Sequence, residues 1–414
     1  MYACITLSAF NDNYYKTSLA ILLTFQFAAK MGIDAATLIN CAAAFFIMPF
    51  FLCSGLAGEF ADEMPQHRLV RILKTTEALL MFAAAAALMI EQTWILLGLL
   101  FLIGVQAAFF GPTKYAILPQ LLKPDELLLG NGLVEGGTFL SILVGTLLGG
   151  LLILLPHGKE IVSATLVLVG LLGVYAAWRV PETTVANPGM RIDYNIFRST
   201  WKMLRHAFHN PRLSVPIMGI SWFWAVGVIY LNQLPVFTKE VLGGNQIVVT
   251  LFNVVFSVGI ALGSFICPYL VERMHPRNLT TMALGGLCLF GLDLCWVGYH
   301  IAPPTADALI GLVAYLSASF DHVRIALDLL VMAFCGGMFI VPLYTQLQTQ
   351  SAPAERARTI ASNNVINALF IATASAMAFF LFAHHFTVLH VLVIFNLLNI
   401  PVIVLLRWLG HRGK

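Results

Sequence analysis

Long apolar segments recur along the whole of this 414-residue chain and restrict it to one fold class. A helix needs roughly 17 to 25 residues to cross the hydrocarbon of a membrane. Twelve such segments follow one another: 1–28, 36–58, 69–90, 93–118, 127–155, 160–178, 213–235, 246–271, 279–298, 324–348, 357–383 and 386–408. Only 10% of the residues are charged, and the mean hydropathy of +0.86 is far above that of a soluble domain. Short alternating strands of a membrane barrel are missing. We predict an all-α integral membrane protein with twelve transmembrane helices.

The sequence also argues against several functional classes. The first segment lacks a basic leader and a small-residue cleavage site, so we expect it to stay in the membrane. All seven cysteines fall in apolar segments without metal-ligand spacing, which favours buried small side chains over a redox or metal site. There is no GxxxxGK[ST] phosphate loop, so ATP is not expected to supply energy. We expect no cofactor, no metal and no nucleic-acid partner.

Basic residues are concentrated in the connections on one side of the membrane. With Met1 in the cytoplasm, that side receives the six basic residues of 179–212 and also Arg68, Arg71, Lys74, Lys123, Arg273, Arg277, Arg356, Arg358, Arg407, Arg412 and Lys414. The opposite side receives Lys30, Lys159, Lys239 and Arg324. Because loops rich in Lys and Arg stay in the cytoplasm, we predict that both termini are cytoplasmic.

One long polar connection divides the chain. It covers residues 179–212 and separates an N-terminal six-helix half at 1–178 from a C-terminal six-helix half at 213–414. Within it, NIFRSTWKMLRHAFHN places apolar and basic side chains at helical spacing, which predicts an amphipathic helix on the inner membrane surface. A plain linker helix with a solvated basic face and a helix that binds anionic lipid both fit this pattern.

The two halves resemble each other in sequence. GEFADEMPQHRLVR and CPYLVERMHPRNLT place Asp62 and Glu272 at matching positions, each two residues before a methionine. Residues 111–135 and residues 340–370 each contain a proline, a tyrosine, a short acidic turn and then an asparagine. This asparagine is Asn131 in the first half and Asn363 in the second. Two pseudo-symmetric six-helix repeats around a central path are the plan of a secondary transporter that alternates access.

Asp12 and Lys16 stand four residues apart on one face of the first segment. At ~1.5 Å per residue, Asp12 lies roughly 18 Å from Met1, about the middle of the bilayer. An ionisable side chain at that depth needs a partner, a wet cavity or a function. Either the two form an internal ion pair that only orients the helix, or, with Asn11 and Asn13, they form a hydrated patch that faces cargo.

Lys114 follows Gly111 and Pro112, which are expected to break the fourth helix and free backbone carbonyls. Its depth fits two interpretations. The side chain either snorkels to the inner surface or belongs to a polar site with Asn131 and Glu135.

Two carboxylates in this half need partners, because a buried carboxylate is neutral unless it is paired. Glu77 has Lys74 one turn before it, and Lys114 is the expected partner of Glu135. A network of this kind across helices three, four and five fits a gate as well as it fits a ligand site.

Polar residues in the second half are mostly uncharged. The candidates for substrate contact there are Asn232, Tyr344 and Asn363, although interhelical hydrogen bonds explain many amides in membrane helices. Gly263 and Gly337 favour close helix contacts over sites. One charged half and one amide-rich, apolar half suit a substrate with a zwitterionic or anionic head group and a greasy remainder.

Several motifs resemble those of a known family. GEFADEMPQHRLVR is similar to the loop-two signature of the major facilitator superfamily, in which an aspartate and arginines bridge helix ends and stabilise one access state. That resemblance implies gating roles for Asp62, Arg68 and Arg71, and the expected gate also includes Lys74 and Glu77. SAFNDN, GPTKYAILPQL, ELLLGNGLVEGGT and FIVPLYTQLQ look like the lysophospholipid transporter branch, closest to the transporter portion of its fusions with acyltransferase and acyl-acyl-carrier-protein synthetase domains.

The resemblance implies a major facilitator fold that moves lysophospholipids, such as lysophosphatidylethanolamine, from the outer to the inner leaflet of the bacterial inner membrane. The family's helix-one acid corresponds to Asp12 and its helix-four lysine to Lys114, so the ammonium would meet Asp12 and the phosphate Lys114. Some members carry an arginine in helix seven, where this chain has Leu231 and Asn232, which leaves the head group open. The full set of expected substrate-binding residues is Asp12, Lys16, Lys114, Asn131, Glu135, Asn232, Tyr344 and Asn363.

Partners and coupling are less constrained. The chain stops at Lys414, directly after the twelfth segment, so an acyltransferase or acyl-acyl-carrier-protein synthetase is expected on a separate polypeptide or not at all, and this chain is expected to be a monomeric non-enzyme. Na⁺ coupling, H⁺ coupling and downhill movement stay open. Two other functions also stay open: export of small amphipathic or cationic compounds, with Asp12 and Glu135 as proton carriers, and a non-transporting scaffold or sensor.

Overall fold

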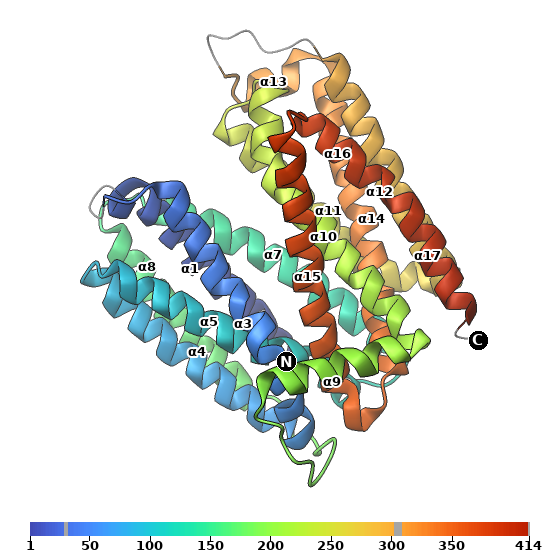
Figure 1. Ribbon diagram of the computed structural model, residues 1–414. Coiled ribbons are helices and arrows are strands. Elements are labelled where there is room, and N and C mark those ends of the chain that lie inside the picture. The colour runs from blue at the N-terminus through green and yellow to red at the C-terminus, as the bar shows by residue number, and fades with distance from the viewer. Residues whose placement is uncertain (29–31, 302–308, 413–414) are drawn as a thin grey trace. The chain divides into compact units, whose positions relative to one another are not determined.

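The chain is all-helical in the computed structural model, which describes residues 1–28, 32–301 and 309–412 (Figure 1). Over these residues the β-pairing is limited to one isolated bridge, between Gly244 and Ile310. Eleven of the described helices are long and apolar enough to span a membrane. The first helix has 21 residues and is not among them, because the polar patch around Asp12 lowers its hydropathy. The chain is therefore a multi-pass helical membrane protein, as predicted.

The described residues pack as two compact units. The N-terminal unit consists of Met1–Gly130, Leu140–His209 and Leu347–Val365. It holds α1 (Tyr2–Leu22), the π-helical turn η1 (Leu23–Phe27), α3 (Ala35–Glu63), α4 (Gln66–Met89), α5 (Thr93–Ala116), α6 (Leu118–Leu121), most of α7 (Leu127–Leu152), α8 (Gly158–Trp178), α9 (Ile196–His209), η2 (Pro353–Glu355) and the start of α15 (Arg356–Ala383). Lys30 and Lys414, expected on opposite sides of the membrane, lie outside the described residues.

The C-terminal unit consists of Asn131–Phe139, Asn210–Gln346 and Ile366–Lys414. It holds α10 (Pro211–Glu240), α11 (Gln246–Val271), α12 (Pro276–His300), α13 (Leu312–Ala318), most of α14 (Phe320–Gln350), the rest of α15, α16 (Val388–Leu397) and α17 (Asn399–Arg412). The last membrane span combines α16 and α17.

Apolar and aromatic side chains on α1, α4 and α5 build the core of the N-terminal unit. Tyr14 and Tyr15 of α1 belong to one buried cluster with Met81 of α4 and Leu97 of α5. The Tyr15 hydroxyl donates to the carbonyl of Leu96, with 2.8 Å between the oxygens. Such packing and interhelical hydrogen bonds hold membrane helices together, because lipid tails are as apolar as the helices themselves. These contacts fix the rotation of α1 about its axis, and with it the direction in which the polar patch faces.

The path of α5 corrects the expectation that Gly111 and Pro112 break the fourth helix. α5 runs through both residues to Ala116, and the helical path is interrupted only at Ile117, before the short α6. Proline removes one backbone hydrogen bond, and neighbouring helices in a bundle make this tolerable within a membrane span. Lys114 is therefore held on a continuous helix.

Close helix contacts in the C-terminal unit confirm the interpretation of its glycines. A Cβ atom on Gly263 of α11 would lie 1.9 Å from the carbonyl oxygen of Phe334 in α14, and one on Gly337 of α14 would lie 2.2 Å from the carbonyl oxygen of Ile260. Only hydrogen fits in these positions, so α11 and α14 pack backbone to backbone.

Candidate functional site

Four polar side chains from three helices meet in the core of the N-terminal unit. Lys74 and Glu77 of α4 form an ion pair, with 2.6 Å between Nζ and Oε2, which confirms the pairing predicted from their spacing. Ser8 of α1 donates to Glu77 Oε2 and accepts from Lys74 Nζ at 3.1 Å. Gln106 of α5 donates to the same carboxylate oxygen at 3.2 Å. The side chains of the ion pair are at most 1% exposed.

This buried network is balanced in charge. Desolvating an ammonium and a carboxylate is costly, and their attraction offsets the cost only when further hydrogen bonds satisfy both groups. Ser8 and Gln106 supply such bonds, and sequence spacing alone gave no signal for either residue. The network joins α1 to α4 and α5, so it fixes the helix that carries Asp12.

Asp12 and Lys16 occupy the half-buried side of α1. Within the described residues, no hydrogen bond or ion pair joins them, so the internal ion pair is not formed in this structure. Lys16 Nζ instead lies 4.3 Å from the centroid of the Phe46 ring in α3, a cation–π contact. Asp12 Oδ1 is buried and has no hydrogen-bond partner among the described residues.

Lys114 and Asn363 complete the polar residues predicted in this unit. Lys114 is half-buried on α5, with Nζ 4.8 Å from the centroid of the Tyr115 ring. Asn363 of α15 is fully buried, and neither polar atom of its side chain has a hydrogen-bond partner among the described residues. The N-terminal unit thus contains a carboxyl oxygen with unused acceptor capacity, together with two half-buried lysine side chains. Side chains of these types can bind a zwitterion.

The remaining substrate candidates belong to the C-terminal unit. Asn131 donates to the hydroxyl of Thr345 at 3.1 Å, and the Tyr344 hydroxyl accepts from a tryptophan of α10 at 3.3 Å. Glu135 is fully buried in α7, whereas Asn232 is exposed on α10. The sequence-based site is therefore divided between the two units. Across the described ranges, no group of three or more His, Cys, Asp or Glu side chains could hold a metal ion.

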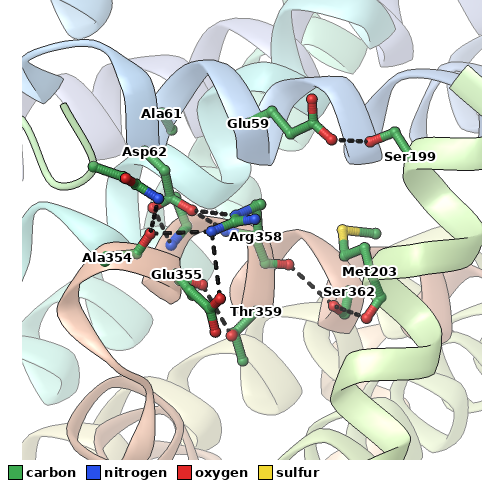
Figure 2. Close-up of polar contacts among 12 residues, drawn as sticks. Glu59, Ala61, Asp62, Ser199, Met203, Ala354, Glu355, Arg358, Thr359 and Ser362 are labelled. Carbon is green, nitrogen blue, oxygen red and sulfur yellow. Dashed lines mark hydrogen bonds and ion pairs between the residues drawn. The ribbon is translucent and has the colours of Figure 1, made fainter. Parts of the chain in front are cut away.

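A second polar cluster joins the end of α3 to the start of α15 and is shown in Figure 2. Asp62 is fully buried, and its carboxylate accepts from Arg358 Nε at 3.0 Å, from the backbone N–H of Ala357 at 3.0 Å and from that of Arg358 at 3.3 Å. These N–H groups belong to the first turn of α15, where backbone donors are unpaired and the helix dipole favours an anion. We call this contact the α3–α15 latch.

The partner of Asp62 is the part of the latch that the sequence interpretation missed. Arg68 is exposed and makes no side-chain hydrogen bond or ion pair within the described residues, and Arg71 instead donates to the carbonyl of Val180 at 3.4 Å. Arg358 lies 296 positions from Asp62, so no local spacing pointed to it. Glu272, at the matching position of the second half, is exposed.

Residues of the connection between α8 and α9 cover the latch. The backbone N–H of Asn187 donates to the carbonyl of Asp62 at 2.8 Å, and its side chain donates to the carbonyl of Ala354 at 3.4 Å. One turn earlier on α3, Glu59 accepts from the hydroxyl of Ser199 in α9 at 2.6 Å (Figure 2). The latch is therefore backed by both the connection and α9.

An apolar pocket lies among α10, α11, α12 and α14 of the C-terminal unit. Its lining includes Phe223, Gly227, Phe256, Leu287 and Met332. The Cβ position of Gly227 has no heavy atom within 4 Å, so this glycine leaves open space on the pocket wall. The walls of this pocket are therefore aliphatic and aromatic.

Comparison with known proteins places these features in a family. The lysophospholipid transporter LplT of Cronobacter sakazakii is 26% identical over 363 residues, 87% of this chain and 81% of that protein. LplT of Escherichia fergusonii is 25% identical over 388 residues, 92% of this chain and 86% of the relative. Among solved structures, the human organic anion transporter MFSD10 has a TM-score of 0.75 at 14% identity, covering 98% of both chains, and the outward conformation of FucP has a TM-score of 0.66 at 14% identity, covering 99% of both. A model of the Major Facilitator Superfamily matches residues 1–375. The chain belongs to the major facilitator superfamily.

Proposed function

We propose that this protein is a secondary transporter that moves lysophospholipids from the outer to the inner leaflet of a bacterial inner membrane by alternating access. The observation that carries the proposal is the buried oxygen of Asp12 without a hydrogen-bond partner, in the same unit as the ammonium groups of Lys16 and Lys114. A lone carboxylate oxygen in a membrane span is costly unless it serves a ligand. Similarity to proteins named lysophospholipid transporters over most of the chain supports this choice of cargo.

The two charges of a zwitterionic head group have separate roles in this proposal. The ammonium of lysophosphatidylethanolamine binds Asp12 Oδ1, and its phosphate binds Lys114, with Lys16 as a second cation. Lys16 is free to take this role because it contacts the Phe46 ring and not Asp12. The single acyl chain lies on apolar surface, and the pocket around Gly227 is an apolar space within the C-terminal unit.

The test is transport of a fluorescent lysophosphatidylethanolamine by the purified protein in proteoliposomes. A membrane-impermeant reductant destroys the fluorescence of labelled lipid in the outer leaflet. The fluorescence that remains therefore measures the lipid that has moved to the inner leaflet. Asp12→Asn and Lys114→Ala each remove a charge-assisted contact worth roughly tenfold or more in binding. We expect each variant to lower transport at limiting substrate by roughly that factor.

Lys159→Ala is the matched control. It removes a cation at the start of α8 whose ion-pair partner is Glu91 and not Asp12. Transport at the parent rate by both site variants, with protein levels equal to the control, would exclude this site. A parent protein that transports no lysolipid but exports amphipathic cations would overturn the cargo and support an exporter.

Orientation, coupling and partners form part of the same proposal. Both termini lie in the cytoplasm, as the distribution of basic residues favours. The accessibility of tags at the two termini in spheroplasts tests this orientation. The α3–α15 latch acts as a gate that opens once per transport cycle.

The protein works as a monomer without enzymatic activity and supplies lysolipid to a separate acyltransferase or acyl-acyl-carrier-protein synthetase. Dissipating H⁺ and Na⁺ gradients separately in the proteoliposome assay identifies the coupling ion or shows downhill movement.

A further inference from the structure

α9 has two faces with different surroundings. On its inner face, Ser199 and Met203 are buried; Ser199 donates to Glu59 of α3, and the Met203 carbonyl accepts from Ser362 of α15 at 3.4 Å (Figure 2). Its outer face carries large aromatic side chains, and Phe197 is 78% exposed and Trp201 69% exposed. α9 therefore bonds to the two helices of the latch with its inner face and presents aromatic rings on its outer face.

The position of α9 in the chain places it at a membrane surface. It ends at His209, and the membrane-spanning helix α10 begins at Pro211, so a single residue separates the two. Aromatic side chains are enriched at the boundary between hydrocarbon and head groups, where an amphipathic helix buries its apolar stripe. Phe197 and Trp201 form such a stripe, one helical turn apart.

A basic stripe follows the aromatic one on α9. Arg198 Nε and Nη2 donate to the two carboxylate oxygens of Asp193 at 2.6 and 2.7 Å, and Lys202 Nζ lies 3.1 Å from Asp193 Oδ2. Arg198 holds the pKa of this carboxyl well below its usual range. A bidentate guanidinium and a neighbouring ammonium are also the groups that bind a phosphate. With Arg205 exposed on the same side, the cations outnumber the one acid.

We propose that the outer face of α9, formed by Phe197, Arg198, Trp201 and Lys202, docks on anionic phospholipid at the membrane surface, where lipid phosphate replaces Asp193 on the two cations. The occupant is a lipid surface because the aromatic stripe adjoins the basic one, and a free phosphate ion would not use the rings. Docking stabilises the latch, because the inner face of α9 bonds to Glu59 of α3 and Ser362 of α15, the two helices that the latch joins. This inference concerns membrane lipid and does not depend on the identity of the cargo.

The experiment measures which lipid touches Trp201. The protein is reconstituted in phosphatidylcholine vesicles that contain a minor fraction of brominated phosphatidylglycerol or, separately, of brominated phosphatidylcholine. The chain has seven tryptophans, so the Trp201 contribution is the difference in emission between the parent and Trp201→Phe. We expect this difference to be quenched more strongly by the anionic lipid. Arg198→Gln/Lys202→Gln should remove most of the preference, because each cation near an anionic surface strengthens binding roughly fivefold.

Two further variants separate docking from general effects of charge. Lys123→Gln/Arg179→Gln removes two exposed cations elsewhere and should keep the preference. Asp193→Asn frees the cations and should increase it, whereas a purely structural Asp193 bridge would give no increase. Equal quenching by both lipids, no quenching by either, or an undiminished preference in Arg198→Gln/Lys202→Gln would overturn the proposal. Thermal unfolding of each variant in detergent verifies that it is folded.

Discussion

Lys74 and Glu77 show how one pair of residues can fasten several membrane helices. Their side chains are buried, and Ser8 and Gln106, from two other helices, both donate to Oε2 of the carboxylate. Removing one partner of a buried ion pair leaves an uncompensated charge, which costs about 3 to 5 kcal/mol. We expect Lys74→Met and Glu77→Gln to lower the free energy of unfolding in detergent by about this amount. The double variant should recover much of the loss, and a double variant as unstable as the sum of the single ones would contradict this account.

Gly227 is a second position where one residue should have a measurable effect. A leucine there would enter the apolar pocket without meeting any heavy atom at its Cβ. If hydrocarbon of the substrate uses this space, each displaced methylene lowers binding roughly fourfold, from ~0.8 kcal/mol per buried CH₂. We expect Gly227→Leu to shift the transport preference toward shorter acyl chains in a competition assay with mixed lysolipids.

Gly285 provides the control for that experiment. Its Cβ position is also open, and it is not part of the pocket lining, so Gly285→Leu should keep the parent preference. An unchanged preference in both variants would place the acyl chain elsewhere.

Single residues were predictable from the sequence when their partners were local. Lys74 and Glu77 are three positions apart on one helix, and that spacing was sufficient. Arg358 was not recognisable as the partner of Asp62, because a carboxylate in one loop signature does not specify which distant helix start will supply its donors. Asp12 was recognisable by its depth in an apolar segment, while its lack of a bond to Lys16 depends on Phe46 of another helix.

Among whole elements, the contact between α11 and α14 offers the sharpest test. A Cβ on Gly263 would overlap the carbonyl of Phe334, so alanine there must push the two helices apart. We expect Gly263→Ala to lower the thermal unfolding temperature. Gly98→Ala in α5 adds the same methyl group where nothing lies within 4 Å, and it should be neutral or stabilising, because alanine is preferred over glycine in helices by about 1 kcal/mol. Similar behaviour of the two variants would refute backbone-to-backbone packing.

Helix positions followed from apolar length, and helix interruptions did not. Eleven of the twelve segments set by hydropathy coincide with described helices that are long and apolar enough to cross a membrane, which takes about 20 apolar residues. The expected break at Gly111 and Pro112 was wrong, because a proline in a packed membrane helix can lose one hydrogen bond without ending the helix. The amphipathic pattern of 195–210 is occupied by α9, whose two faces differ as that pattern requires.

At the scale of the whole molecule, the α3–α15 latch should be sensitive to geometry as well as charge. Two of the three donors to Asp62 are backbone N–H groups of α15, so position 62 needs an anion whatever stands at position 358. We expect Asp62→Asn to destabilise the protein by roughly 1.5 to 3 kcal/mol per weakened charge-assisted bond. The charge swap Asp62→Arg/Arg358→Asp should not restore stability or transport. Full rescue by the swap would show that the ion pair alone matters.

The major facilitator plan could be inferred from internal repeats and loop signatures, and the family match over residues 1–375 agrees with it. The linear division at 179–212 could not reveal that α9 and the start of α15 pack with the N-terminal unit. Those contacts depend on tertiary hydrogen bonds that the carboxylates of Glu59 and Asp62 accept, and composition does not encode them.

The latch also affects how the protein is made. Asp62 and Arg358 are separated by 296 positions, and ribosomes add roughly 5 to 20 residues per second. Arg358 is therefore synthesised roughly 15 to 60 s after Asp62. During that interval the N-terminal unit lacks residues 347–365 and the end of α3 has no helix start to bind. Completion of the first half of the transporter is thus one of the last events of its biosynthesis.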